Sequence, residues 1–193
     1  IMTYVFTKIS GLPEDQIMGS GTILDTARLR YGLSEHFQVA QGNIHAYVFG
    51  EHGDTSFIPW TGAYISGLST DEYYEEMKAH GKDVKPLDKE AMLEYVQKSG
   101  GKVIAKKGAT FYAVSATVCQ LVGLILAASD SLATVSSMLH GEYGIEDVCL
   151  STLTLVGPNG IQGKVQMRMN KEEIELLKKS ANALKEVIAQ IEL

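Results

Sequence analysis

The order of strand-like and helix-like segments is the feature that most constrains the fold of this chain. Ala133–Leu139 and Val148–Val156 both read as strands, and no helical pattern lies between them. A turn at 157–160 that contains Gly, Pro and Asn is followed by a returning strand at Gly163–Met169. Strands joined in this way pair antiparallel, whereas parallel strands need a crossover connection, usually a helix. We therefore expect an α+β fold, in which long helices pack on antiparallel sheets.

Helical spacing of apolar residues predicts helices on both sides of this strand region. The helix that begins at Asn170 has Glu173 at its third position, and its expected buried stripe is Ile174, Leu177, Ala181, Leu184, Ile188 and Ile191. A helix from about Thr22 to His36 is expected to bury Leu24, Ala27 and Leu33. The remaining predictions are a strand at 43–50 and helices at 1–9, 71–80, 87–107 with an interruption at Gly100 and Gly101, and 110–128. No linker or repeat separates these elements, which predicts one domain over residues 1–193.

Composition argues against two classes of function. The formal net charge of −6 argues against a nucleic-acid-binding protein, which would carry a basic surface. The longest apolar stretch, Val114–Ala128, is interrupted by polar residues and is short for a bilayer, so we expect a buried helix and no membrane span.

Cys119 and Cys149 lie in apolar runs and are expected to be buried, reduced thiols. No spacing of His and Cys predicts a metal site.

Two glycine-containing segments approach nucleotide-binding motifs without completing them. Gly19 and Gly21 match the first two glycines of a dinucleotide fingerprint, but Leu24 occupies the third position and no convincing strand precedes them. Gly157–Lys164 is longer than a phosphate loop by one residue, and Val165 replaces the Ser or Thr that would bind magnesium. We therefore expect no complete cofactor site in this chain. The chain also begins without an initiator Met, as though within a helix, which predicts a piece of a longer protein.

One group of residues can perform acid–base chemistry. Asp25 and Arg28 are three positions apart on a predicted helix and share a face, and His52 follows a predicted strand. Histidine suits proton transfer near neutral pH, and a carboxylate that accepts from its second ring nitrogen would fix its tautomer. Arginine suits a carboxylate substrate because its planar fork donates two parallel hydrogen bonds. Spacing alone also allows a plainer interpretation, in which Asp25 and Arg28 are a surface ion pair and His52 is an ordinary loop residue.

Two stretches that contain these residues resemble the lactate/malate dehydrogenase family: 21–31, Gly-Thr-Ile-Leu-Asp-Thr-Ala-Arg-Leu-Arg-Tyr, and 50–55, Gly-Glu-His-Gly-Asp-Thr. The likeness covers essentially the whole chain, which matches the carboxy-terminal half of family members. The resemblance implies that His52 donates and accepts the proton, that Asp25 holds the histidine and that Arg28 binds the substrate carboxylate. It also implies a substrate contact for Thr110, which could equally cap a helix. NAD is the implied cofactor, bound mainly by an amino-terminal Rossmann domain that is missing from this chain.

Within the family, the chain is similar to the L-lactate dehydrogenases. Glu51 stands where malate dehydrogenases usually have Gly, and Thr110 fits the lactate side. The implied reaction is the reversible reduction of pyruvate by NADH to L-lactate, as in glycolysis and fermentation, by a cytoplasmic homotetramer. The loop that most directly selects the substrate would lie outside this chain, which we expect to be inactive alone. Three alternatives remain: a malate or branched-chain 2-hydroxy-acid dehydrogenase, a non-catalytic oligomerisation module, and a metal hydrolase built on His52 and Asp54.

Arg30 and His45 belong to a second expected site. Arg30 is about 200° around the helix from Arg28, and His45 lies seven residues before His52, so neither can easily reach the pocket of His52. Their positions resemble those that bind fructose 1,6-bisphosphate between subunits in the allosteric bacterial lactate dehydrogenases. The resemblance therefore implies an effector site in a homo-oligomer, and the plainer interpretation is two unrelated surface residues.

Overall fold

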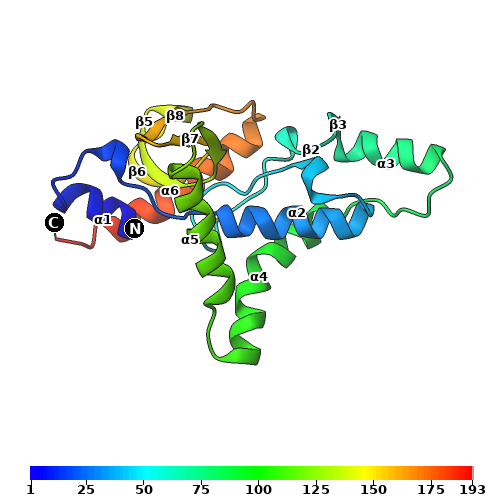
Figure 1. Ribbon diagram of the computed structural model, residues 1–193, viewed down its shortest axis with the longest axis horizontal. Coiled ribbons are helices and arrows are strands. Elements are labelled where there is room, and N and C mark those ends of the chain that lie inside the picture. Colours follow the sequence, from blue (N-terminus) through cyan, green and yellow to red (C-terminus); the bar gives the residue numbers. More distant parts are fainter. Residues whose placement is uncertain (193) are drawn as a thin grey trace.

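The computed structural model describes residues 1–192, which hold six α-helices and eight short β-strands (Figure 1). The helices are α1 (Met2–Ile9), α2 (Ile23–Phe37), α3 (Thr70–Ala79), α4 (Lys89–Lys107), α5 (Tyr112–Ile125) and α6 (Lys171–Ile188). The strands are β1 (Ile44–His45), β2 (Tyr64–Ile65), β3 (Leu68–Ser69), β4 (Ser131–Ala133), β5 (Ser136–His140), β6 (Glu146–Ser151), β7 (Thr154–Gly157) and β8 (Gly160–Lys164).

The strands form three small sheets, with the orders β1-β2-β3, β4-β7-β8 and β5-β6. Every ladder among the described residues is antiparallel, so the expected α+β fold is confirmed. The sheets built from β4 to β8 lie together at one end of the molecule, with α6 alongside them, and α3 lies at the opposite end (Figure 1).

Two predicted strands are each divided between two sheets. The segment predicted as one strand at Ala133–Leu139 splits into β4 and β5, and the segment at Val148–Val156 splits into β6 and β7. Because β4 pairs with β7 and β5 pairs with β6, the chain passes twice from one sheet to the other. Hydropathy does not mark these crossings, since Val135 and Leu153 are as buried as the strand residues beside them.

Two further predicted strands are displaced or shortened. The returning strand begins at Gly160 rather than Gly163, immediately after the turn. Gly160 has a positive φ of 87°, and a Cβ there would lie 2.2 Å from the carbonyl oxygen of Asp15, so only glycine fits this approach. The strand predicted over 43–50 is regular only in β1, and it continues as isolated bridges at Phe49 and Gly50.

Helix α6 matches its prediction because each local signal agrees. Asn170 and Glu173 form a reciprocal capping box, with both hydrogen bonds at 2.9 Å. Leu177, Ala181 and Leu184 are buried against the sheet of β5 and β6, Ile174 and Ile188 are half-buried, and Ile191 of the predicted stripe lies beyond the end of the helix. The apolar stripe therefore places α6 beneath this sheet.

The buried face of α2 differs from the predicted one, since Leu24 is half-buried and Ala27 is exposed. The residues that are buried are Ile23, Asp25, Thr26, Leu29, Leu33 and Phe37. The difference turns on Thr26, whose hydroxyl lies 3.1 Å from the Thr134 hydroxyl and accepts from the Val48 amide at 3.0 Å. A hydroxyl with both partners is buried at little cost, which a hydropathy stripe does not register.

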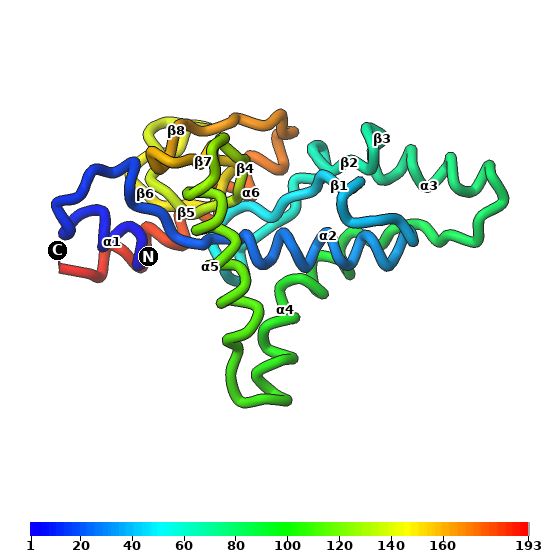
Figure 2. The backbone as a smooth tube through the Cα atoms, viewed as in Figure 1, coloured from blue at the N-terminus to red at the C-terminus, as the bar shows by residue number. Residues whose placement is uncertain are grey.

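Helices α4 and α5 form an arm that leaves the body of the molecule (Figures 1 and 2). Helix α4 runs unbroken through Gly100 and Gly101, so the predicted interruption is wrong. One glycine costs a helix only about 1 kcal/mol relative to alanine, which the rest of a long helix outweighs. Asp88 caps the start of α4 by accepting from the Ala91 amide at 2.9 Å, and Gly108 ends it with a φ of 78°.

Helix α5 is not the buried helix that its apolar sequence predicts. Only Thr117 and Leu121 are buried, whereas Val114, Val118 and Val122 are each 42–46% exposed. Composition reports how apolar a helix is, but it does not report whether a neighbouring element covers it. The projecting arm leaves much of this helix uncovered by the described part of the chain.

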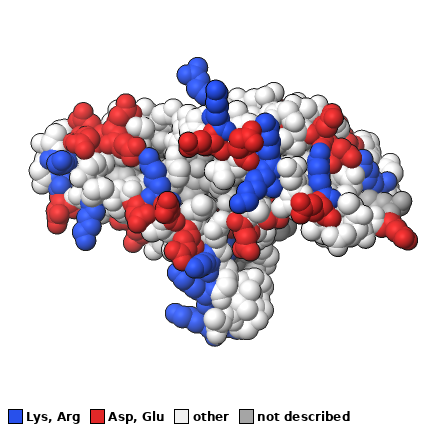
Figure 3. All heavy atoms as spheres, turned by 180° about the vertical axis from the view of Figure 1, so that it is seen from behind, with Lys and Arg blue, Asp and Glu red and all other residues white. Residues whose placement is uncertain are grey.

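The two cysteines differ in exposure. Cys149 is buried as expected, but Cys119 lies on α5 and is exposed. Within residues 1–192, no helix combines the length and apolarity needed to cross a membrane. On the face seen in Figure 3, acidic and basic side chains are interspersed.

Candidate active site

The start of α2 positions Asp25 and Arg28. In the segment before the helix, Gly19 pairs with Ser136 of β5 through backbone hydrogen bonds of 2.8 and 3.0 Å. Gly21 has a φ of 52°, and a Cβ there would lie 2.5 Å from the Ser151 hydroxyl and 2.6 Å from the Ser136 amide. Glycine is therefore required where the chain crosses the strands closely, and this crossing fixes where α2 begins.

A loop at 51–54 places His52. Before the loop, Gly50 exchanges two backbone hydrogen bonds of 3.0 Å with Ser151 of β6, and Phe49 exchanges two with Phe57. The rings of Phe49 and Phe57 are buried and meet edge to face, with centroids 6.4 Å apart. The core thus fixes both ends of the loop and leaves His52 at the surface.

The carboxylate of Asp25 contacts both of the other predicted residues, His52 and Arg28. His52 Nδ1 lies 2.6 Å from Asp25 Oδ2, and Arg28 Nη1 donates to Asp25 Oδ1 at 2.9 Å. The exposed fractions of the side chains are 6% for Asp25, 17% for Arg28 and 60% for His52. The structure therefore brings these residues together, with Asp25 on the inside and the imidazole facing outward.

The Asp25 carboxylate favours the protonated imidazole of His52. Its hydrogen bond is the largest cause that raises the pKa of His52 above 6.5, while burial and the positive charge of Arg28 oppose the rise. With Nδ1–H donated to Asp25, the second ring nitrogen, Nε2, has no hydrogen-bond partner among the described residues. This arrangement can deliver a proton from Nε2 to a bound molecule and take one back.

Arg28 retains donors for a ligand. Only its Nη1 atom contacts Asp25, and its Nη2 atom passes close to Gly100 of α4, 3.9 Å from where a Cβ would lie. The remaining N–H groups match the oxygens of a carboxylate.

Thr110 is not brought to these three residues. It lies exposed in the connection between α4 and α5, and no hydrogen bond within residues 1–192 links it to Asp25, Arg28 or His52. Nor does it cap α5, because Phe111 occupies that position without a side-chain bond. Its helix-cap interpretation is wrong, and its substrate contact stays a prediction.

Arg30 and His45 lie apart from His52, as their spacing predicts. Arg30 Nε donates to the Ala46 carbonyl at 3.1 Å, and its guanidinium stacks over the Tyr47 ring at 5.0 Å. His45 is the last residue of β1, immediately before Ala46, and is exposed. Arg30 therefore lies against the backbone next to His45, and no hydrogen bond among the described residues links either side chain to Asp25, Arg28 or His52.

Ser180 and Gln97 contact the loop of His52, and neither was predicted. Ser180 lies in α6 and Gln97 in α4, far from the loop in sequence. One local signal existed for Ser180, which is a small polar residue on the buried stripe of an amphipathic helix. Gln97 gave no signal, since a glutamine on a helix is ordinary.

The described residues contain no group of three or more His, Cys, Asp or Glu side chains placed to hold a metal ion. His52 and Asp54, the pair considered for a metal hydrolase, thus have no third ligand of these types within residues 1–192.

Comparison with known proteins identifies the family. The model of the lactate/malate dehydrogenase, alpha/beta C-terminal domain matches residues 22–192. This chain belongs to the lactate/malate dehydrogenase family. The resemblance expected from the two motifs is therefore confirmed, and the match includes Asp25, Arg28 and His52.

The relatives within the lactate/malate dehydrogenase family are longer than this chain. The chain is 45% identical over 193 residues to the L-lactate dehydrogenase of Acetivibrio thermocellus, covering 100% of the chain and 60% of that protein. It is 42% identical over 191 residues to L-lactate dehydrogenase 1 of Clostridium acetobutylicum, covering 99% and 60%. The chain thus spans about three fifths of the length of these relatives.

Solved structures agree with this fold. The L-lactate dehydrogenase from Clostridium thermocellum superposes with a TM-score of 0.89 at 36% identity, over 100% of this chain and 62% of that one. The minor L-lactate dehydrogenase from Enterococcus mundtii superposes with a TM-score of 0.91 at 30% identity, over 100% and 60%.

Proposed function

We propose that this chain is the substrate-binding and proton-transfer part of an NAD-dependent L-lactate dehydrogenase of the cytoplasm. The observation that supports the proposal is the Asp25 carboxylate, which contacts His52 with one oxygen and Arg28 with the other. An ordinary surface ion pair between Asp25 and Arg28 would not also hold a histidine 2.6 Å from the same buried carboxylate. The names of the relatives favour lactate over malate or a branched 2-hydroxy acid.

Each residue has a distinct role in the proposed reaction. The free N–H groups of Arg28 bind the carboxylate of pyruvate and orient the molecule. His52 gives its Nε2 proton to the keto oxygen, and in the reverse direction it accepts the hydroxyl proton of L-lactate. Asp25 keeps Nδ1–H in place and stabilises the imidazolium before the transfer.

The glycine segment before α2 does not fit the pyrophosphate of NAD. Gly19 pairs with Ser136, and a Cβ at Gly21 would meet Ser136 and Ser151, so these glycines lie against the strands and do not form an open loop around a pyrophosphate. We therefore place the nucleotide site, and with it the source of hydride, in a part of the longer protein outside this chain. It follows that these 193 residues alone should not oxidise NADH.

A chimera tests the proposal. The amino-terminal part of the Acetivibrio thermocellus enzyme that this chain does not match would be joined before Ile1, and NADH oxidation would be measured with pyruvate, oxaloacetate and longer 2-keto acids. We expect pyruvate to be the preferred substrate, and we expect His52→Gln to lower kcat/KM by at least about 10²-fold because proton transfer is lost. A preference for oxaloacetate would indicate the malate alternative. Activity of the chain alone, free of any full-length enzyme, would contradict the assignment of the cofactor site.

We also propose that Arg30 and His45 bind fructose 1,6-bisphosphate between two copies of the subunit in a homotetramer. The support is that Arg30 donates to the carbonyl of Ala46, the residue after the exposed His45, so an arginine and a histidine lie near enough to face a symmetry mate together. Activation of the chimera by this effector should weaken in Arg30→Ala and His45→Ala, but not in His80→Ala at the end of α3. Full activation in both test variants would remove the proposal.

A further inference from the structure

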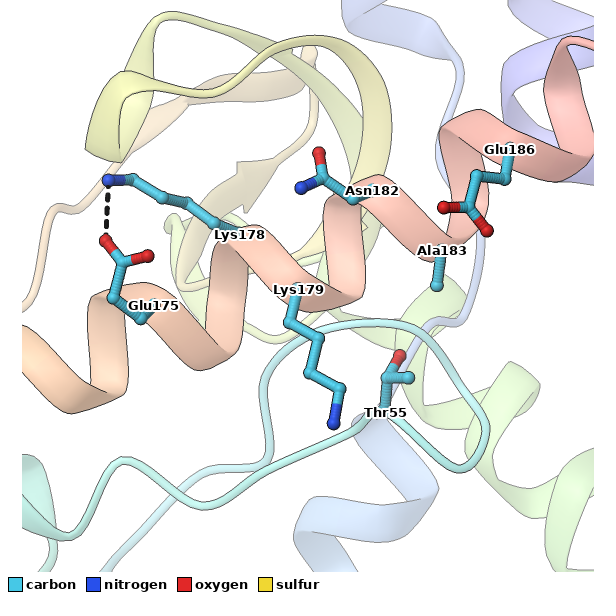
Figure 4. Close-up of a pocket in the computed structure, with 7 residues that line it drawn as sticks. All are labelled: Thr55, Glu175, Lys178, Lys179, Asn182, Ala183 and Glu186. Atoms are coloured by element: carbon cyan, nitrogen blue, oxygen red, sulfur yellow. Dashed lines mark hydrogen bonds and ion pairs between the residues drawn. The ribbon is translucent and has the colours of Figure 1, made fainter.

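The loop of His52 is bonded to α6 through side-chain hydroxyls. Ser180 is fully buried, and its Oγ accepts from the Glu51 amide at 2.8 Å and lies 2.9 Å from the Thr55 hydroxyl. Thr55 Oγ1 in turn donates to Glu51 Oε1 at 2.6 Å. Figure 4 shows Thr55 on the segment that passes beneath α6.

These contacts have one consistent direction. Since the Thr55 hydroxyl proton goes to Glu51, the Ser180 hydroxyl must donate to Thr55. The result is a closed ring of hydrogen bonds, from the Glu51 amide to Ser180, to Thr55 and back to the Glu51 carboxylate. Each hydroxyl donates once, so loss of either one opens the ring.

The backbone of the loop approaches α6 too closely for the contact to be incidental. Gly50 has a φ of 95°, and a Cβ there would lie 2.7 Å from Ser180 Oγ. Helix α4 also contacts the loop, because Gln97 Nε2 donates to the carbonyls of Asp54 and Ser56, on either side of Thr55, at 3.2 and 2.9 Å. The ring therefore links the Glu51 end of the loop, next to His52, to Thr55 and to α6.

We propose that Ser180, Thr55 and Glu51 are positioning residues, which set the distance between His52 Nδ1 and Asp25. His52 is mostly exposed and has one hydrogen-bond partner among residues 1–192, so its backbone must be held by other groups. The inference rests on the proposed proton transfer for its consequence in catalysis. The positioning itself is measurable without substrate.

Two variants of Thr55 form a matched pair. Thr55→Val keeps the shape and removes the hydroxyl, whereas Thr55→Ser keeps the hydroxyl and removes a methyl group. In the 193-residue chain, NMR titration should show the pKa of His52 falling toward 6.5 in Thr55→Val and staying raised in Thr55→Ser. The resonance is assigned by its loss in His52→Gln. Ser180→Ala should act like Thr55→Val, and the double variant should add little, because both open the same ring.

Asn182→Ala is the control on α6, since Asn182 points away from Thr55 (Figure 4). In the chimera, Thr55→Val should lower kcat about tenfold while KM for pyruvate changes by less than about twofold, because Arg28 is untouched. An unchanged pKa of His52 in Thr55→Val would overturn the inference, even if the variant unfolds more easily. If Ser180→Ala does not fold, the Thr55 pair decides. An inactive chimera with a shifted pKa would count against the proposed function alone.

Discussion

Asp25 is shared between a histidine and an arginine, and this sharing governs the protonation of the site. Replacing it by Asn keeps the shape but removes the charge that favours the imidazolium. We expect Asp25→Asn to lower the pKa of His52, measured by NMR titration of the histidine ring. Asp54→Asn, in the loop of His52, is the control for the loss of a carboxylate. Equal titration curves for Asp25→Asn and the parent chain would contradict the assigned cause of the raised pKa.

The same contact makes stability depend on pH with a definite sign. Because the folded state raises the pKa of His52, the stabilisation is fully present below about pH 6.5, the unfolded value, and is lost as pH rises through the folded value. The parent should therefore exceed Asp25→Asn in unfolding free energy by more at about pH 6 than at about pH 9. The effect should be small, since His52 is 60% exposed and solvent screens it.

At the scale of elements, the glycines of α4 allow a prediction with a built-in control. Gly101 is helical and exposed, and a Cβ there meets nothing within 4 Å. Gly101→Ala should raise the free energy of unfolding by about 0.5–1 kcal/mol, measured by urea denaturation. Gly108→Ala should lower it by about 1 kcal/mol, because the helix ends there at a φ of 78°. Destabilisation by both would indicate that α4 is not helical at Gly101.

The elements also show which structure the sequence can predict. Helix α6 was predicted with its cap and stripe because Asn170, Glu173 and Leu177 all point to the same helix. The buried face of α2 was not predicted because Thr26 is buried through its hydrogen bonds. The strand breaks were not predicted because Val135, which connects β4 to β5, is as apolar and buried as the strands that it joins. Asp25, Arg28 and His52 could be found from two local motifs. Ser180 could not, since its contact with Glu51 spans 129 positions.

For the whole molecule, the uncovered side of α5 predicts association. Val114, Val118 and Val122 share a helical face and are exposed, with Leu126 beyond them 79% exposed. We expect the 193-residue chain to self-associate as its concentration rises, and Val118→Lys to shift it toward monomer, measured by sedimentation velocity. Gln120→Lys adds the same charge on another face of α5 and should leave association unchanged. Equal association of Val118→Lys and the parent would show that this face is not involved.

The ring of hydrogen bonds between the loop and α6 also bears on biosynthesis. A ribosome releases the segment with His52 long before Ser180, which lies 129 positions after Glu51, so the nascent loop lacks its contact with α6 while the intervening sheets are being made. If the ring has the proposed role, the imidazole takes its full position only after α6 has docked. A molecule interrupted during translation before α6 would therefore carry Asp25, Arg28 and His52 but lack the contacts proposed to position the imidazole.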